Sequence, residues 1–472
     1  MTRDGRGPRK VGKRQDGRQA RPAAADPARR AAYDVLHEVG SSDAYANLTM
    51  RLVFADRRLT TRDAGFATEL VMGVLRHRGT LDAVLAAAVD RPLAKLDPRV
   101  LDVLRLGAYQ LLFLGTAPHA AVGSSVDLAG EVCGPGPKGL VNAVLRTVAR
   151  RDLADHLAQV TMDLTPAEAM AVRTSHPAWI VSSLRDALGG DDEALAALLA
   201  RNNDVPTVTL AARPGRINRD DLLALAPDGA ESGAWSPYAV RLRHGRPGDL
   251  APVRDHRAGV QDEGSQLMAL LLADAPLTGV DRTWLDLCAG PGGKAALLAS
   301  LAHERDAALL AVEPRAARAR LVAQALAGAR ATAVVQADGR AGPWQPDTFD
   351  RVLVDAPCTG LGVLRRRPEA RWRRTPADVA ALTTLQRALL HAATDAVRPG
   401  GLVAYVTCSP HIAETDLVVD DVLASRSDLV EVDARAGLPT AATAAAGGGP
   451  RVRLWPHLHD TDGMFAALLR KR

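Results

Sequence analysis

The chain has 472 residues, 47% of them hydrophobic, and a formal net charge of +5 at pH 7. This length exceeds what one ordinary core organises, so we expect two or three domains. Because no uncharged apolar run of ~18 residues and no secretory leader occur, the sequence predicts a cytoplasmic protein. The four cysteines, at 133, 288, 358 and 408, form no C-x-x-C pair, so neither a disulfide framework nor a metal site is expected.

Residues 1–26 form a basic tail that we expect to be disordered, because its Arg, Gly, Pro and Lys residues offer almost nothing to bury. Residues 1–30 carry ten Lys and Arg against three Asp, a net charge of +7, which leaves −2 for the rest of the chain. Two interpretations stay open. The tail is either an arm that binds nucleic-acid phosphates or a solubilising extension.

Residues 27–154 predict an all-α bundle. Its clearest helix spans residues 97–114, with Asp97 as N-cap, Pro98 at the first helical position and apolar residues at helical spacing. Further helices are expected over 28–39, 62–76, 120–132 and 139–150. His119 is expected to be a loop or cap residue rather than a base. The stretches ARRAAYDVLHEV and GLVNAVLRTVARR resemble the NusB family, which implies an RNA-binding domain.

Residues 155–255 are expected to form a small α+β region. The pattern is helical over 165–201 and 219–226, and it alternates like a strand over 206–213 and 238–242.

Residues 256–472 alternate short Val- and Leu-rich runs with helical ones, which predicts an α/β Rossmann-like domain with a parallel, doubly wound sheet. The expected strands are 283–288, 308–313, 331–336, 351–355 and 401–407. Residues 441–449 (AATAAAGGG) are expected to be a floppy insertion before final strands at 452–455 and 464–469.

The stretch WLDLCAGPGGK, residues 284–294, reads as a strand, a glycine turn and a helix start. Such a turn places a helix N-terminus against a cofactor. It is not a phosphate-binding P-loop, because Cys288 replaces the first glycine of that motif and Ala295 follows the lysine.

Acidic or thiol side chains stand where the next four predicted strands end, and ligands of such sheets bind outside those ends. Glu313 comes twenty residues after Gly293, where a carboxylate would bind ribose hydroxyls. The carboxylate of Asp338 could accept a hydrogen bond from an adenine amino group. Asp355 and Cys408 end the last two strands. Each alone could be a helix cap or a buried hydrophobe, but four in register predict a nucleoside-shaped pocket.

Two thiols, Cys358 and Cys408, beside such a pocket suggest cytosine chemistry. A thiolate that adds to carbon 6 turns the ring into an enamine whose carbon 5 can take a methyl group from a sulfonium. An acid near ring nitrogen 3 would help, and Asp355 could supply it.

The motifs DLCAGPGGK, VDAPCTGLGVLRRRPEARWRR and YVTCSP resemble those of RNA (cytosine-5) methyltransferases, and with the NusB-like domain the chain resembles the RsmB (Sun/Fmu) type that methylates 16S ribosomal RNA. The resemblance implies S-adenosylmethionine as cofactor, Cys408 as nucleophile and Cys358 as the residue that assists product release. It places the cofactor against Cys288, Ala289, Gly290, Pro291, Gly292, Gly293, Lys294, Glu313, Asp338 and Asp355. After YVTCSP the family usually has Glu-Glu-Asn, whereas Ala413-Glu414-Thr415 stands here, and Met464 replaces a Phe in its Asp-Gly-Phe-Phe; both changes concern local packing.

A cationic strip follows the Cys358 strand and is expected to bind RNA phosphates, with an aromatic residue for stacking. The alternative is a solvated Arg-rich helix with a buried Trp. The strip comprises Arg365, Arg366, Arg367, Arg371, Trp372, Arg373 and Arg374. The target base should be unpaired or flipped out.

Other functions compete with this interpretation. A NAD-dependent oxidoreductase would explain the glycine turn and Glu313 but not the two thiols. A non-catalytic RNA-binding or ribosome-assembly factor would not need Asp355, Cys358 and Cys408. A transfer-RNA cytosine methyltransferase would share the catalytic motifs, and only the N-terminal bundle favours ribosomal RNA. We expect a monomer.

Overall fold

A computed structural model of the chain describes residues 26–42 and 44–472. The chain divides into two compact units, one comprising residues 1–71 and 84–153 and the other residues 72–83 and 154–472. The expected disordered tail lies outside the described residues, apart from Asp26. Within the described ranges, no helix is both long and apolar enough to cross a membrane.

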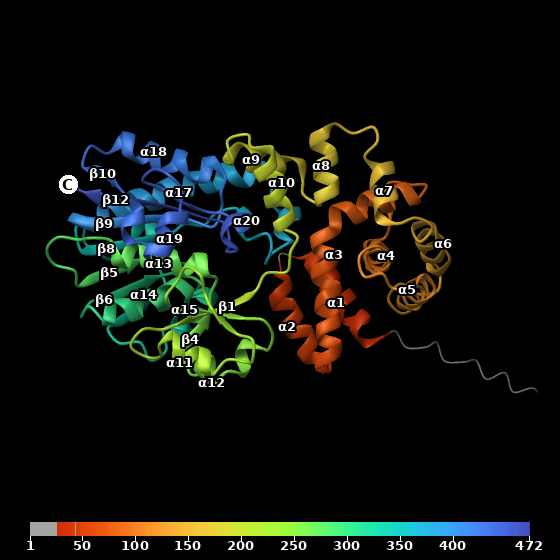
Figure 1. Cartoon of the computed structure of the whole chain (residues 1–472), viewed down its shortest axis with the longest axis horizontal. Helices are drawn as coiled ribbons and strands as arrows, with labels where there is room; N and C mark the ends of the chain where they lie inside the picture. The colour runs from red at the N-terminus through yellow and green to blue at the C-terminus, as the bar shows by residue number, and fades with distance from the viewer. Residues whose placement is uncertain (1–25, 43) are drawn as a thin grey trace, which may run out of the picture. The chain divides into compact units, whose positions relative to one another are not determined.

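The first unit is helical, as predicted (Figure 1). Asp97 caps α4 by accepting a hydrogen bond from the backbone N of Arg99 at 2.9 Å, and Pro98 is the first residue of that helix. His119 is exposed in the first turn of α5, so it lies in a helix rather than in a loop. The helices are α1 (Pro27–Ser41), α2 (Ala46–Asp56), α3 (Thr61–Ala88), α4 (Pro98–Leu112), α5 (Pro118–Val132) and α6 (Lys138–Val148), with a 3-10 turn at Leu93–Lys95.

The middle of α3, residues 72–83, packs with the second unit rather than the first. There the backbone N of Gly79 donates to Oγ of Ser175 at 2.9 Å, and Oγ1 of Thr80 donates to the carbonyl O of Val172 at 2.6 Å. Val172 lies in α8 (Pro166–Thr174), and Ser175 follows that helix directly. The neighbouring helices of the chain are α7 (Leu153–Val160), α9 (Ala178–Ala187) and α10 (Asp192–Arg201). One segment of an N-terminal helix is therefore part of the second unit's structure.

A small antiparallel sheet follows, with the strand order β2-β3-β1-β4. Two of its strands coincide with runs predicted from alternation, at 206–213 and 238–242. Its elements are β1 (Val208–Ala212), α11 (Arg219–Ala224), β2 (Glu231–Ser232), β3 (Ala239–Leu242), a 3-10 turn at Pro247–Asp249, α12 (Ala251–Arg254) and β4 (Ala258–Val260).

The large sheet has the order β10-β12-β9-β8-β5-β6-β7, with β11 paired to β12. Its elements up to β9 are α13 (Glu263–Asp274), β5 (Thr283–Asp286), α14 (Gly293–His303), β6 (Ala308–Val312), α15 (Ala316–Ala325), β7 (Thr332–Val335), β8 (Phe349–Asp355), α16 (Ala370–Arg373), α17 (Pro376–Ala396) and β9 (Val397–Thr407). The remaining elements are α18 (Asp416–Ser425), β10 (Leu429–Val432), α19 (Thr440–Ala445), β11 (Val452–Leu454), α20 (Pro456–His459) and β12 (Met464–Lys471). Short 3-10 turns lie at Gly339–Ala341, Leu361–Val363, Ile412–Glu414 and Ala434–Gly437.

The predicted parallel arrangement is confirmed from β9 through β8, β5 and β6 to β7. It does not extend to the end of the chain, because β12 pairs antiparallel with β9, β10 and β11. The expected floppy insertion at 441–449 is partly wrong, since α19 occupies its first half and buries Ala442 in the core. Ala446, which follows the helix, is buried as well. The Ala-rich composition that suggested flexibility is also that of a good helix former.

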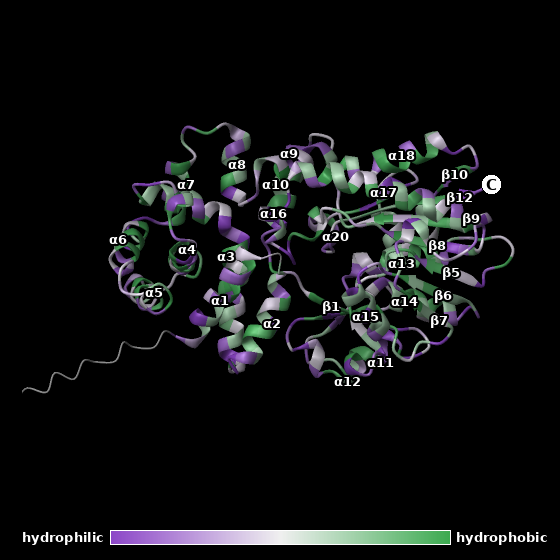
Figure 2. Cartoon of the chain, turned by 180° about the vertical axis from the view of Figure 1, so that it is seen from behind, coloured by the Kyte–Doolittle hydropathy of each residue, from purple (hydrophilic) through white to green (hydrophobic). Residues whose placement is uncertain are grey.

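Helices cover both faces of the large sheet. On one face α13 and α14 bury nearly all of their side chains against β5, β6 and β9, and Figure 2 colours both helices largely as hydrophobic. On the other face α17 and α18 pack against β8 and β9. The carboxyl ends of the parallel strands therefore meet at one edge, where ligands of such sheets bind.

Candidate active site

The loop 287–292, between β5 and α14, is pressed against neighbouring elements. Gly292 has a φ of +113°, a region open to glycine. A Cβ at Gly292 would lie 2.6 Å from Cβ of Ala325 in α15, and a Cβ at Gly290 would collide with the carboxylate of Glu313. The glycines therefore let the loop approach α15 and the end of β6 closely, at the start of α14.

Glu313 follows β6 directly and its side chain is buried. Its carboxylate accepts a hydrogen bond from the backbone N of Arg315 at 3.0 Å and lies 3.5 Å from Nε of Arg318. Arg318 also donates to the carbonyl O of Gly290, so it joins the acidic strand end to the glycine loop. Sequence analysis missed Arg318; its signal is its position five residues after Glu313, in the first turn of a helix.

Asp338 lies three residues beyond β7 and is more exposed than the other strand-end acids. Its side chain is 45% exposed and pairs with Arg340. The hydrogen bond from Arg340 lowers the pKa of Asp338. Its carboxylate is thus ionised and accessible at the same edge of the sheet.

Asp355, the last residue of β8, accepts a hydrogen bond from Nζ of Lys294 at 2.9 Å. Lys294 lies in the first turn of α14 and is mostly buried. Burial alone would lower the pKa of Lys294, but the carboxylate of Asp355 outweighs it and raises that pKa. The two side chains therefore form an ion pair at the edge of the sheet.

Asp286, at the end of β5, is a carboxyl group that sequence analysis did not single out. It is fully buried, and burial, followed by the charge of Asp355, raises its pKa to about 7. Oδ1 accepts from the backbone N of Cys288 at 3.3 Å, whereas Oδ2 has no partner among the described residues. Below pH 7 this group therefore favours its neutral form.

Cys358 and Cys408 meet, with their Sγ atoms 3.4 Å apart and both thiols free. Cys408 follows β9 and Cys358 lies in the loop after β8. A hydrogen bond from Cys358 lowers the pKa of Cys408, and the charges of Lys294 and Arg367 act in the same direction. Donation of that hydrogen bond and burial raise the pKa of Cys358. Of the two thiols, Cys408 is therefore the one that loses its proton more readily.

The expected cationic strip is wrong in part, because several of its members are buried or paired internally. Arg365 is 1% exposed and donates to Asp460 at 2.9 Å. Arg366 pairs with Asp262 at 2.6 Å and with Asp462 at 2.9 Å. The sequence pattern could not reveal these acids, since they lie about a hundred residues away along the chain.

Arg371 and Trp372 are also turned inward. Arg371 is fully buried and donates to the carbonyl O atoms of Arg76, Ser175 and Asn202 and to Oδ1 of Asn203. Nε1 of Trp372 donates to the carbonyl O of Leu75 at 3.2 Å.

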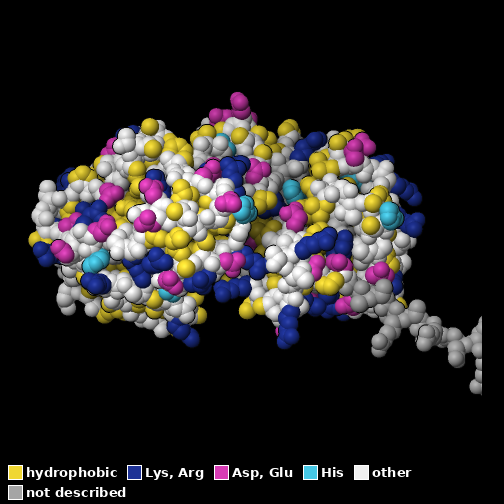
Figure 3. Space-filling view, turned by 60° about the horizontal axis from the view of Figure 1, so that its bottom comes forward, with side chains coloured by type: hydrophobic (Ala, Val, Ile, Leu, Met, Phe, Trp, Pro, Cys, Tyr) yellow, Lys and Arg dark blue, Asp and Glu magenta, His cyan; other side chains and the backbone are white. Residues whose placement is uncertain are grey.

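The remaining arginines of the strip are more accessible. Arg367 is exposed, and Arg373 and Arg374 are half-buried. On the face in Figure 3, basic side chains lie among acidic ones.

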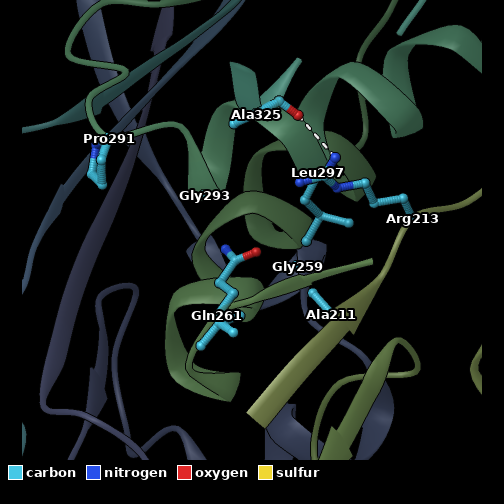
Figure 4. A pocket seen from close by; sticks show the side chains of 9 residues that line it. Ala211, Arg213, Gly259, Gln261, Pro291, Gly293, Leu297 and Ala325 are labelled. Carbon is cyan, nitrogen blue, oxygen red and sulfur yellow. Dashed lines mark hydrogen bonds between the residues drawn. The ribbon is translucent and has the colours of Figure 1, made fainter. Parts of the chain in front are cut away.

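A cavity of about 210 Å³ lies beside the glycine loop, on the side of β1 and β4 (Figure 4). Gly293 and Leu297 of α14 line it together with Arg213, Gly259 and Gln261. In the figure the guanidinium of Arg213 is joined to the carbonyl O of Ala325, a distance of 2.8 Å. The cavity shares the loop with the strand-end acids, but the two thiols are not among its lining residues.

Two family models match the chain. The model described as 16S rRNA methyltransferase RsmB/F matches residues 274–470, and that of the NusB family matches residues 26–150. A protein of Mycobacterium tuberculosis (strain H37Rv) named a putative methyltransferase is 50% identical over the whole of both chains. A Bacillus subtilis protein named probable ribosomal RNA small subunit methyltransferase B is 30% identical over 93% of this chain and 98% of its own.

Solved structures share the fold. The crystal structure of PH0851 superposes with a TM-score of 0.79 at 21% identity, covering 96% of this chain and 100% of the other. That of a methyltransferase homolog protein from Pyrococcus horikoshii gives a TM-score of 0.52 at 20% identity, covering 66% of this chain and all of its own.

Proposed function

The chain belongs to the RsmB/F family of 16S rRNA methyltransferases, and from this premise we propose that it methylates carbon 5 of a cytosine in 16S rRNA. The observation that carries the proposal is the pair of thiols 3.4 Å apart. A route through a covalent adduct at carbon 6 needs one thiolate to attack and a way to release it again. The ion pair of Lys294 and Asp355 stands beside them.

The methyl donor of the proposal is S-adenosylmethionine, and the residues at the sheet edge fit it. The glycine loop leaves backbone open at a helix start, and Glu313 holds a buried carboxylate beside it, which suits ribose hydroxyls. When bound, this cofactor supplies an electrophilic methyl group on its sulfonium. We assign its binding to residues 288–294 with Glu313, Asp338 and Asp355, and add Arg318, which contacts Gly290 and Glu313.

In the proposed reaction, the thiolate of Cys408 adds to carbon 6 of the cytosine. The electron pair of the ring's 5,6 double bond shifts toward nitrogen 3, which takes up a proton from the Lys294–Asp355 pair. Carbon 5, now part of an enamine, is the atom that is methylated. Because Lys294 holds its proton against Asp355, the pair can neutralise the charge that develops on the ring.

Release reverses the addition. Carbon 5 loses its proton to solvent water, and nitrogen 3 returns its proton to the Lys294–Asp355 pair. The 5,6 double bond re-forms and the thiolate of Cys408 leaves. Cys358, whose sulfur touches that of Cys408, is the group placed to assist this step. Its thiol can donate a hydrogen bond to the departing sulfur and so stabilise the negative charge there.

We assign RNA binding to residues 27–154, which cover nearly all of the NusB match at 26–150, and catalysis to residues 256–472, with 155–255 as a linker region. Exposed Arg367 and half-buried Arg373 and Arg374 are proposed to contact phosphates near the target base. That base must leave any duplex, because a thiol cannot reach the face of a stacked ring. The proposal is for a cytoplasmic monomer that acts on ribosomal RNA before or during assembly of the small subunit.

The test is methyl transfer from labelled S-adenosylmethionine to unmethylated small-subunit rRNA, with transfer RNA in parallel. Wild type should label rRNA. Cys408→Ala should be inactive, and Cys358→Ala should accumulate an RNA–protein adduct that survives denaturing gels. If Cys408→Ala forms the adduct and Cys358→Ala does not, the roles are reversed. If wild type labels only transfer RNA, the chemistry stands and the substrate is wrong.

A further inference from the structure

Glu414 is a buried carboxylate that the proposed reaction does not use. It ends the 3-10 turn Ile412–Glu414, six residues after Cys408, and its side chain is 0% exposed. No salt bridge to Glu414 forms among the described residues. An ionised group in such a place is costly unless hydrogen bonds satisfy it, so the partners of this carboxylate indicate what it does.

Those partners flank Cys358. Oε1 accepts from the backbone N of Thr359 at 2.8 Å and from Nε2 of Gln386 at 3.2 Å, and Oε2 accepts from Oγ1 of Thr359. Nε2 of Gln386, in α17, also donates to the carbonyl O of Pro357 at 2.8 Å. The residues before and after Cys358 are therefore both tied to the same Glu414–Gln386 pair.

Glu414 is also connected to the strand end that carries Cys408, through Thr359 and through its own backbone. Oγ1 of Thr359 lies 3.1 Å from Oγ of Ser409. A hydroxyl has one proton to donate, and that of Thr359 goes to Glu414, so Ser409 donates to Thr359. Oη of Tyr405, in β9, donates to the carbonyl O of Glu414 at 2.8 Å.

The two thiols differ in what else holds them. Cys408 follows a strand that is paired on both sides, since Val406 of β9 is opposite Asp355 of β8 and Ala466 of β12. Cys358 lies in a loop beyond the end of β8, and this loop depends on Glu414 and Gln386 for the contacts beside the thiol. Loss of the carboxylate should thus displace Cys358 more than Cys408.

We propose that Glu414 is a positioning residue that holds the thiol of Cys358 against Cys408, and that it acts on adduct release rather than on adduct formation. The second half of this statement rests on the proposed function. Glutamine is the sharpest probe, because Glu414→Gln keeps the shape of the side chain but removes the carboxylate and one of its two acceptor oxygens. The hydrogen bonds at stake are to a charged acceptor, which are the stronger kind.

The first experiment needs no RNA. Diamide, a mild oxidant that takes two electrons and two protons from a pair of thiols, joins them as a disulfide. In wild type we expect the Cys358–Cys408 disulfide, detected by peptide mass spectrometry, to form quickly. It should form about tenfold more slowly in Glu414→Gln, as expected for loss of one strong hydrogen bond. Glu431→Gln, the same change at a glutamate of β10 that pairs with Arg451, is the matched control and should behave as wild type.

The second experiment uses the full chain with rRNA. Glu414→Gln should form the denaturation-resistant adduct within about threefold of the wild-type rate and turn over about tenfold more slowly, so that the adduct accumulates as in Cys358→Ala. Thr359→Val, which removes the hydroxyl but keeps the N–H donor, should show a weaker form of both effects. Thr359→Val replaces Glu414→Gln as the test variant if thermal melting shows that Glu414→Gln is unstable.

Two results would overturn the proposal: disulfide formation in Glu414→Gln and Thr359→Val at the wild-type rate, or adduct formation and release slowed in parallel. A slow disulfide in Glu414→Gln would still support the positioning role if wild type transferred no methyl group to any RNA and Cys358→Ala formed no adduct. Those two results would contradict the proposed function instead.

Discussion

Three neighbours lower the pKa of Cys408. Cys358 donates a hydrogen bond to it, and Lys294 and Arg367 add positive charge nearby. Asp355 and burial act in the opposite direction. The net effect lowers the pKa of Cys408 below its ordinary 9.0, so more of this thiol is ionised at neutral pH than in a free cysteine.

The lowered pKa of Cys408 determines how its alkylation by iodoacetamide depends on pH. The alkylation rate can be measured on the Cys408 peptide by mass spectrometry. In wild type the rate should reach half its maximum below pH 9.0. Cys358→Ala removes the donor and should move that midpoint upward, because a thiolate without its hydrogen bond is less stable. Cys133, whose pKa is raised chiefly by burial, is the internal control. An unchanged midpoint in Cys358→Ala would contradict the shared-proton arrangement.

At the scale of the element, the glycine loop offers a prediction for Gly292→Ala. Its φ of +113° and the contact with Ala325 both oppose a side chain. We expect a stability loss of about 1–3 kcal/mol, as for other residues forced into such backbone, and weaker binding of S-adenosylmethionine because the loop shifts.

Thermal melting and titration calorimetry with S-adenosylmethionine would measure both effects. The control is Gly448→Ala, where an added Cβ meets nothing within 4 Å and the change should stay within about 0.5 kcal/mol. Cofactor affinity in Gly292→Ala equal to that of wild type would show that this loop does not hold the ligand.

Local pattern predicted much of the large sheet and of the site. Strand ends in a parallel sheet share one edge, so the sequence alone places Asp355 and Cys408 near each other. The pairing of Lys294 with Asp355 could not, because the length of a turn does not fix where a flexible side chain points. The antiparallel insertion of β12 beside β9 also escaped prediction, since strand order depends on contacts far apart in the sequence.

The arginines after Cys358 illustrate the same limit. A run of like charges usually lies in solvent, and the acids that pair with Arg365 and Arg366 lie far from them in the sequence. Their partners come from the residues after β4 and before β12. Burial of Arg371 by carbonyl oxygens is harder still to foresee, because backbone acceptors have no sequence signature.

At the scale of the whole molecule, the two units are not consecutive in the sequence. Residues 72–83 of α3 belong with residues 154–472, and they supply acceptors to Arg371 and Trp372. Burial lowers the pKa of Arg371 to about 9, a sign that its guanidinium relies on these carbonyls. A family match that begins at residue 274 does not mark the limit of what the catalytic unit needs to fold.

For protein engineering, the second unit therefore cannot be isolated by a single truncation of the chain. We expect a fragment of residues 154–472 to melt at a lower temperature than the full chain and to aggregate, because the indole of Trp372 loses the cover of Gly79 and Arg371 loses an acceptor. The full chain, melted under the same conditions, is the reference, and an equal melting temperature for the fragment would contradict this expectation. A fusion of the second unit to another RNA-binding protein would have to include residues 72–83 of α3 as well as residues 154–472.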